Sequence, residues 1–293
     1  MQTEKEETVA GMSSALRIMH GVFGRVALLD MDRRLVRHAH PHCHVLLKVD
    51  GDDTQFLVGD AIAPLTGTTA VLVNAWQTHA YIHDPARRDA LILALYIEPD
   101  WLRSFRPNWE ASGAPGFFDR SAGEITPQIR RLAHALAEEM VRDAPASAER
   151  EDLLSSLMIA VIERFTPWKS IGASLRERAR SQTIDRRIRR TIALMRADPS
   201  ASPDIETLAR EAGLSRAHFF RMFEQSTGLS PHVFLNVLRV ETAVGSILNS
   251  GDNLASISDR LGFSAPAHFT RFFRDHASVS PSEFRSVVQI EGD

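Results

Sequence analysis

Near its C-terminal end the chain reads Ile205-Glu-Thr-Leu-Ala-Arg-Glu-Ala-Gly-Leu-Ser-Arg-Ala-His-Phe-Phe-Arg-Met-Phe223, and it repeats this pattern as Leu254-Ala-Ser-Ile-Ser-Asp-Arg-Leu-Gly-Phe-Ser-Ala-Pro-Ala-His-Phe-Thr-Arg-Phe-Phe273. A Ser-Pro-x-x-Phe sequence follows each copy, at 230–234 and at 280–284. The equivalent arginines of the two copies are 50 positions apart and the equivalent glycines 49, so the second copy carries one extra residue near its turn. A repeat of this length indicates two copies of one supersecondary unit.

Each copy predicts two short amphipathic helices joined at a glycine. Apolar residues recur at helical spacing before the glycine, and Pro203-Asp204 is a suitable start for the first helix. The glycines, Gly213 and Gly262, stand where a tight turn often requires a positive φ. Two serines, Ser215 and Ser264, are expected to be the N-caps of the helices that follow. Four phenylalanines of these helices are expected to lie in the core: Phe219, Phe223, Phe269 and Phe273.

This doubled helix-turn-helix resembles the DNA-binding domain of the AraC/XylS family of bacterial transcription regulators over residues of about 185–287. The resemblance is closest in the second copy, from Gly262-Phe263 to Phe284-Arg285. The chain departs from the family pattern at two positions. Ser278 stands where the family and this chain's own Gly228 have glycine, and Ser258 replaces a small alanine.

The resemblance implies that double-stranded DNA is a partner and that the second helix of each unit reads bases in the major groove. The outward positions of these helices are then the expected DNA-binding residues: Arg216, Ala217, Phe220 and Arg221 in the first copy, and Ala267, His268, Thr270 and Arg271 in the second. RNA polymerase is a further expected partner. Between the copies, residues 231–248 predict one continuous helix, about 27 Å long, that could hold the reading helices near one DNA turn apart.

Composition and charge are ordinary for a globular protein. The 293 residues suffice for two domains, and the net charge of −3 shows no overall basicity. Basicity is instead local, because residues 176–190 hold seven arginines against two acidic residues. A single cysteine, Cys43, favours a reducing compartment. The acidic N-terminus does not resemble a secretory signal and no apolar run is long enough to span a membrane, so we expect a cytoplasmic protein without a membrane partner.

The remainder of the chain predicts a second domain that begins with strands. Short β runs punctuated by turn residues occupy residues 17–98 and suggest a sandwich or barrel. AraC-type regulators commonly carry a cupin-like barrel here that binds a small effector. We therefore expect a two-domain fold, an N-terminal all-β cupin-like barrel with a helical hairpin and a C-terminal all-α double helix-turn-helix domain. Its expected divisions are a disordered segment 1–15, an effector-binding and dimerisation domain 16–165, a linker 166–183 and a DNA-binding domain 184–293, with motifs at about 203–225 and 254–276.

Two helices are expected after the strands, at 127–142 and 149–165, and their short connection predicts an antiparallel hairpin. In relatives, helices at this position form the dimer interface, so a homodimer is one interpretation. The other is an internal hairpin that caps the barrel.

Histidines are concentrated in the N-terminal half. His38, His40, His42 and His44 alternate, so a regular strand would place all four on one face, with Cys43 on the other. Their spacing resembles the first cupin motif, with His44 where that motif has glutamate, and His79 resembles the histidine of the second motif. These five histidines are the expected effector-binding residues. They could line an organic-ligand pocket, bind a metal ion, or be structural.

Two classes of function follow. The first is a sequence-specific transcription regulator that responds to a small-molecule effector and has neither catalytic activity nor a cofactor. The alternative is a cupin-type metal-dependent enzyme, or a metal-sensing regulator that uses the histidine cluster. The doubled reading motif and the missing glutamate of the first cupin motif count against the enzyme.

Overall fold

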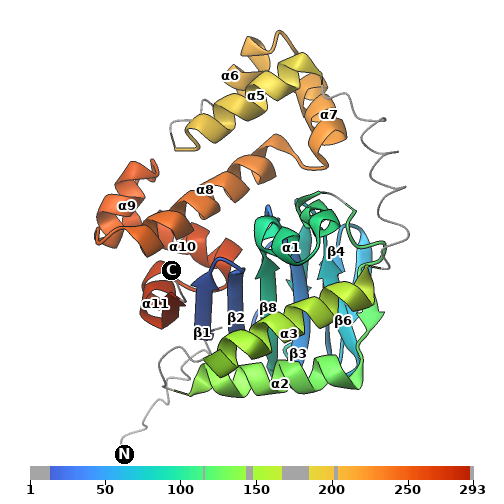
Figure 1. Cartoon of the computed structure of the whole chain (residues 1–293). Coiled ribbons are helices and arrows are strands. Elements are labelled where there is room, and N and C mark those ends of the chain that lie inside the picture. The colour runs from blue at the N-terminus through green and yellow to red at the C-terminus, as the bar shows by residue number, and fades with distance from the viewer. Residues whose placement is uncertain (1–13, 115, 143–147, 167–184, 201–203, 291–293) are drawn as a thin grey trace, which may run out of the picture.

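The computed structural model describes residues 14–114, 116–142, 148–166, 185–200 and 204–290. Figure 1 shows two parts: a β-rich N-terminal domain with two long helices across one face, and a C-terminal array of helices set along the domain's edge. Within the described residues no helix is both long and apolar enough to cross a membrane. Most of the predicted linker lies outside the described residues, as does Pro203.

In the part of the chain that the structure describes, ten strands form two antiparallel sheets, apart from one parallel pair. Seven of them follow the order β10-β1-β2-β8-β3-β6-β9 and three follow β5-β4-β7. Their bounds are β1 Ser14–Gly21, β2 Gly24–Met31, β3 Cys43–Gly51, β4 Thr54–Val58, β5 Ala61–Leu65, β6 Thr69–Val73, β7 His79–Ile82, β8 Ala90–Ile97, β9 Ala122–Glu124 and β10 Val288–Ile290. Of the β runs expected within residues 17–98, those at 26–29, 45–49, 55–58, 70–73 and 91–97 are confirmed as parts of β2, β3, β4, β6 and β8. Strand β1 and the short strands β5, β7 and β9 were not predicted.

The large sheet is covered on both faces, which explains why its strands are nearly continuous apolar runs. On β2, Val26 and Leu28 face one core while Ala27 and Leu29 face the other. The small sheet packs on the second face. Helices α2 (Pro127–Val141) and α3 (Ala148–Phe165) cover the first face, where α1 (Pro99–Phe105) and a 3₁₀ helix (Pro107–Gly113) also lie. The two predicted helices are therefore confirmed, and their buried sides cap the sheet.

The C-terminal part contains both predicted helix pairs. Its helices are α5 Arg186–Ala197, α6 Ile205–Glu211, α7 Arg216–Thr227, α8 Pro231–Asn249, α9 Leu254–Arg260, α10 Pro266–Ala277 and α11 Pro281–Val287. Gly213 and Gly262 adopt positive φ angles of 66° and 74°, as their turns predicted. The continuous spacer helix is confirmed as α8, whose 19 residues span about 28 Å at 1.5 Å per residue.

One predicted cap is wrong. Ser215 caps α7 by accepting from the His218 amide, but the N-cap of α10 is Ala265, which offers no side-chain acceptor. The extra residue of the second copy lies in this turn and moves the helix start one position onward. Ser264 hydrogen-bonds the His268 ring instead, at 2.9 Å.

The two domains meet along a seam that the sequence did not predict. Strand β10, at the C-terminal end, pairs in parallel with β1, and Ile18 lies opposite Val288. Residues of α8, α9, α10 and α11 share an apolar core with the strands. Trp76 stacks on Phe234 of α8 with ring centroids 4.9 Å apart. The second helix-turn-helix unit is thus packed directly against the N-terminal domain.

Candidate functional site: reading helices and a histidine cluster

The two reading helices present equivalent faces. On α7, Arg216, Ala217 and Arg221 are exposed and Phe220 is half-buried. At the matching positions of α10, Ala267 and Arg271 are exposed and Thr270 is half-buried. The predicted reading residue His268 is exposed as well. The opposite faces carry Phe219, Phe223, Phe269 and Phe273, each at most 1% exposed. The buried phenylalanines therefore hold each helix by one face, and the predicted reading residues lie on the other face, where a DNA groove could accept them. His218, equally exposed on α7, occupies the position of His268 and was not predicted.

Positive charge lies beside the first unit. The groove between α5 and α6 is lined by Arg186, Arg187 and Arg190 and has a volume of about 260 Å³. Arg187 is engaged by Asp185, which it contacts at 3.0 Å and whose pKa it lowers to about 2. Both other arginines are exposed. The rest of the basic segment, 176–184, lies outside the described residues.

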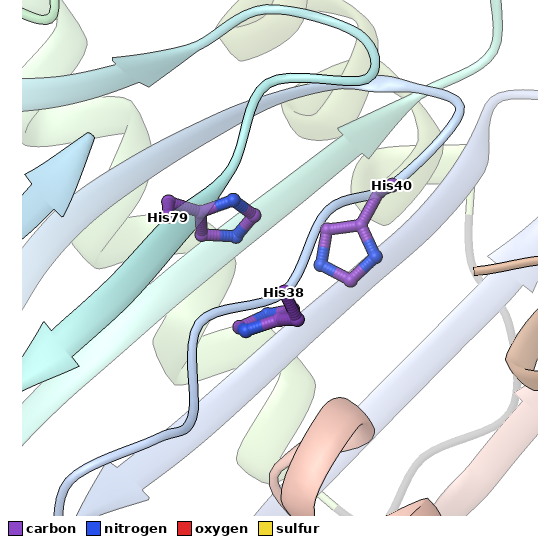
Figure 2. Close-up of side chains that lie close together, drawn as sticks. All are labelled: His38, His40 and His79. Carbon is purple, nitrogen blue, oxygen red and sulfur yellow. The ribbon is translucent and has the colours of Figure 1, made fainter. Parts of the chain in front are cut away.

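A compact histidine cluster lies at the seam between the domains. His38, His40 and His79 each offer a ring nitrogen, and these nitrogens lie within 4.8 Å of one another. Figure 2 shows the three rings gathered about one space, with His38 and His40 on one segment and His79 on the neighbouring one. Backbone hydrogen bonds hold the segments together, because His38 and His79 exchange amide and carbonyl at 2.9 and 2.8 Å. The side chains are buried, with exposed fractions of 3%, 3% and 1%.

The hydrogen bonds of the rings define their tautomers. Nδ1 of His38 lies 2.7 Å from the Val36 carbonyl, and Nδ1 of His79 lies 3.2 Å from the Gln77 carbonyl. A carbonyl only accepts, so each Nδ1 donates and each Nε2 keeps its lone pair. Nε2 of His79 and Nε2 of His40 are buried without a hydrogen-bond partner among the described residues.

Burial keeps these imidazoles neutral. Desolvation, with a contribution from the neighbouring rings, lowers the pKa of His38 and His40 well below the ordinary value. Desolvation likewise lowers the pKa of His79 to about 4. At neutral pH the cluster therefore presents lone pairs and not positive charges.

The prediction that four histidines share one face is wrong for His42. The chain bends at Pro41 and His42, and β3 begins only at Cys43, so the alternation is broken there. His42 turns away and contacts Glu98 at 3.0 Å, lowering the pKa of that carboxyl group. Cys43 points into the opposite core, as expected, and burial raises the pKa of its thiol to about 12.

His44 stays with the cluster but outside its closest triad. Its ring stacks on Tyr96 at 4.1 Å and lies 5.3 Å from His79 between centroids. Both its ring nitrogens are buried and without a hydrogen-bond partner in the part of the chain described. An adjoining cavity, lined in part by His38, His44 and Ser278, has a volume of only about 10 Å³. That is about one water molecule.

Three residues at this seam were not predicted: Trp76, Tyr96 and His276. The ring of His276, on α10, lies 6.5 Å from that of His38. Trp76 has a φ of 63°, unusual for a bulky residue, and sits three residues before His79. Comparing the two repeats could have singled out His276, because its counterpart in the first copy is Ser226.

Comparisons with known proteins agree with both domains. A family model of the AraC-like ligand binding domain matches residues 21–162, and one of a helix-turn-helix domain matches residues 208–286. RhaS of Shigella sonnei, an HTH-type transcriptional activator, is 26% identical over 78% of this chain and 79% of its own. An uncharacterized HTH-type transcriptional regulator of Haemophilus influenzae is 28% identical over 47% of this chain, which spans 46% of that relative.

A solved structure extends the likeness to the fold. The apo form of a ToxT variant from Vibrio cholerae superposes with a TM-score of 0.50 and 13% identity, covering 90% of this chain and 96% of that one. An N-terminal ligand-binding domain joined to a doubled helix-turn-helix defines a class of DNA-binding regulator. The chain belongs to the AraC family of transcription regulators.

Proposed function

We propose that this regulator binds its operator through the exposed N-terminal halves of α7 and α10, each in one segment of the major groove. The observation that carries the proposal is the equivalence of the two faces on one rigid spacer, α8. Arginine can bond guanine through two hydrogen bonds, while Ala, Phe and the Thr methyl can contact a thymine methyl. The arginines of this set, which are suited to reading guanine, are Arg216, Arg221 and Arg271, and the last two occupy equivalent positions in the two copies.

The exposed arginines of α5 would add contacts to phosphate. Such contacts position a protein on DNA and strengthen binding without specifying sequence. They also account for DNA binding by a chain whose net charge is −3, since only local charge is needed.

We further propose that the histidine cluster is the place where the N-terminal domain receives its signal. The cluster lies at the seam, and two aromatic contacts lead from it to the DNA-binding helices: His38 to His276, and the loop of His79, through Trp76, to Phe234. A ligand that shifts these rings would bias the position of α8 and α10. Regulation, and not catalysis, is the role that this arrangement supports.

The remaining partners are inferred by family resemblance. The α2–α3 hairpin uses its buried side to cap the sheet, which leaves only its outer side for a homodimer. RNA polymerase would be contacted at the promoter, and the chain would act in the cytoplasm beside the DNA.

The test is selection of genomic DNA fragments by the purified full-length chain, followed by sequencing. We expect a shared motif with two separated half-elements, and binding to it that exceeds binding to random DNA by about 10³-fold or more. Enrichment without a motif would contradict base reading. A motif with a single element would contradict the use of both helices.

A further inference from the structure

We propose that His38, His40 and His79 bind a divalent transition-metal ion of the zinc class, and that this ion is the signal the N-terminal domain receives. The inference rests on the proposed function only for the second statement, since binding of an ion can be measured without DNA.

The first argument is the donor set. Three imidazole nitrogens from two segments converge within 4.8 Å, and nitrogen donors favour Zn²⁺, Ni²⁺, Co²⁺ or Cu²⁺ over Mg²⁺ and Ca²⁺. Zinc lies about 2.0–2.1 Å from each imidazole nitrogen, so binding would draw the rings together by small side-chain rotations. The backbone hydrogen bonds between His38 and His79 already hold their two segments in place.

The second argument is the tautomer of the rings, which is fixed by their hydrogen bonds to backbone carbonyls. Metal-bound histidines commonly donate their other N–H to a carbonyl, which fixes the tautomer, and His38 and His79 both do so.

The third argument is that two buried ring nitrogens lack a hydrogen-bond partner among the described residues. Buried polar atoms nearly always have a partner, and leaving one unsatisfied is costly. Nε2 of His40 and Nε2 of His79 have no hydrogen-bond partner among the described residues, although both side chains are more than nine-tenths buried. A metal ion held by these lone pairs would relieve that cost.

The fourth argument is size. Organic ligands occupy sites of roughly 300–1,000 Å³, whereas the cavity beside the cluster measures about 10 Å³. That cavity, which His38 and His79 line, has room for about one water molecule that would complete the coordination of an ion held between the rings, and it has no room for an organic effector. Tyr96 and His44 close one side of the cluster by stacking, and His44, with two unpartnered nitrogens, is placed to complete or orient the coordination.

The experiment titrates the full-length chain, stripped with a chelator, with Zn²⁺ alone and separately with Co²⁺. We expect one ion per chain, the visible absorption bands of nitrogen-bound Co²⁺, and a rise of several degrees in the melting temperature. His40→Gln should weaken metal binding by about 100-fold or more, because even a lost outer-shell partner costs 10–100-fold. His42→Gln is the matched control, since His42 faces Glu98 and not the cluster, and it should bind metal like the unaltered chain.

Three results would overturn the proposal: no bound ion with an unchanged melting temperature, equal binding by the unaltered chain and His40→Gln, or binding lost in His42→Gln. Should His40→Gln fail to fold, His79→Gln takes its place, because that ring belongs to the same cluster but comes from the other segment. A parallel titration of the selected operator with the stripped and the Zn²⁺-loaded chain separates the two ideas. Operator binding that is intact but indifferent to Zn²⁺ removes the signalling role alone, whereas absent operator binding removes the proposed function.

Discussion

Residues close together on one reading helix have different roles, one in stability and one in recognition. Phe219 is fully buried, whereas Arg221, two positions on, is exposed. Truncating the first should unfold the unit, and truncating the second should alter only what it binds. Because burial separates the two tasks so cleanly, single substitutions can test stability and recognition independently.

For recognition, we expect Arg221→Ala to weaken binding to the selected operator by about 1–3 kcal/mol and to relax the preference at one base pair. The arginine loses its two hydrogen bonds to guanine. Fluorescence anisotropy at one fixed salt concentration measures the effect, since phosphate contacts vary steeply with salt. Arg103→Ala removes the same charge from α1, a helix of the N-terminal domain, and should change nothing. Equal weakening on operator and random DNA would instead show that Arg221 contacts phosphate.

For stability, we expect Phe269→Ala to lower the free energy of unfolding by about 3–5 kcal/mol. Phe269 is 1% exposed and packs edge-on against Phe273, with ring centroids 5.9 Å apart. Thermal melting of the full-length chain is the measurement, because this unit shares its core with the strands. Arg271→Ala, exposed on the same helix, should stay within about 0.5 kcal/mol of the unaltered chain. An unchanged melting curve for Phe269→Ala would mean that the ring lies outside the core.

Sequence reasoning at this scale succeeds where a residue's surroundings are local. The helical period alone predicts which face of α7 is buried. Sequence reasoning fails at His42, because the prediction of strict alternation assumes a straight strand. The chain instead bends at Pro41, where it packs against the segment of His79. His276 and Trp76 were missed for a similar reason, since their partners lie in the other domain.

At the scale of the element, the two reading helices differ at their first residue. Ser215 gives α7 a side-chain acceptor, at 3.4 Å from the His218 amide, while Ala265 gives α10 none. We therefore expect Ser215→Ala to destabilise the chain and Ala265→Ser to stabilise it, each by about 0.5–2 kcal/mol. Paired melting curves measure both. Ala267→Ser, already inside the helix, is the control and should not stabilise. A gain from Ala267→Ser equal to that from Ala265→Ser would contradict the capping explanation.

Elements with strong periodicity were predictable, and short ones were not. The spacer α8 and the hairpin helices have long apolar stripes, so their limits were placed to within a residue or two. Strands β7 and β9 hold only four and three residues, too few for a period to stand out. Strand β5 contains Pro64, which argues against a strand in a sequence pattern. Strand β10 pairs with β1, which lies at the other end of the sequence. A local pattern in residues 288–290 cannot predict such a pairing.

At the scale of the whole molecule, the seam means that the two domains do not act as separable modules. We expect a fragment of residues 185–293 to bind the operator more weakly than the full chain. In that fragment the second unit loses the pairing of β10 with β1 and its shared apolar core. Anisotropy gives the affinity, and hydrogen exchange should show faster exchange in α9 and α10 than in α6 and α7. Equal protection of both units, with unchanged affinity, would show that the seam carries no stability.

The contact between Trp76 and Phe234 should carry the signal across that seam. Trp76 lies on the same loop as His79, its ring stacks on Phe234 of α8, and the Arg196 guanidinium lies 5.7 Å from its ring centroid. The base of the loop is anchored by Asn74, which bonds the backbone of Phe118 at 2.7 and 3.1 Å. We therefore expect a shift of the His79 ring to be transmitted toward α8 and not absorbed by the loop.

We expect Trp76→Ala to fold and to retain both Zn²⁺ binding and operator binding, while losing most of the effect of one on the other. Coupling between two sites typically amounts to about 5–150-fold in affinity, and removal of the ring should bring that factor close to one. Operator affinity measured with and without Zn²⁺, in the unaltered chain and in the variant, gives the factor directly. Phe105→Ala removes an exposed aromatic ring whose ring contact is Trp101 of the same helix, α1, and should leave the factor intact. A Trp76→Ala chain that still responds fully to Zn²⁺ would leave His276 on α10 as the remaining described aromatic contact between the cluster and the DNA-binding helices.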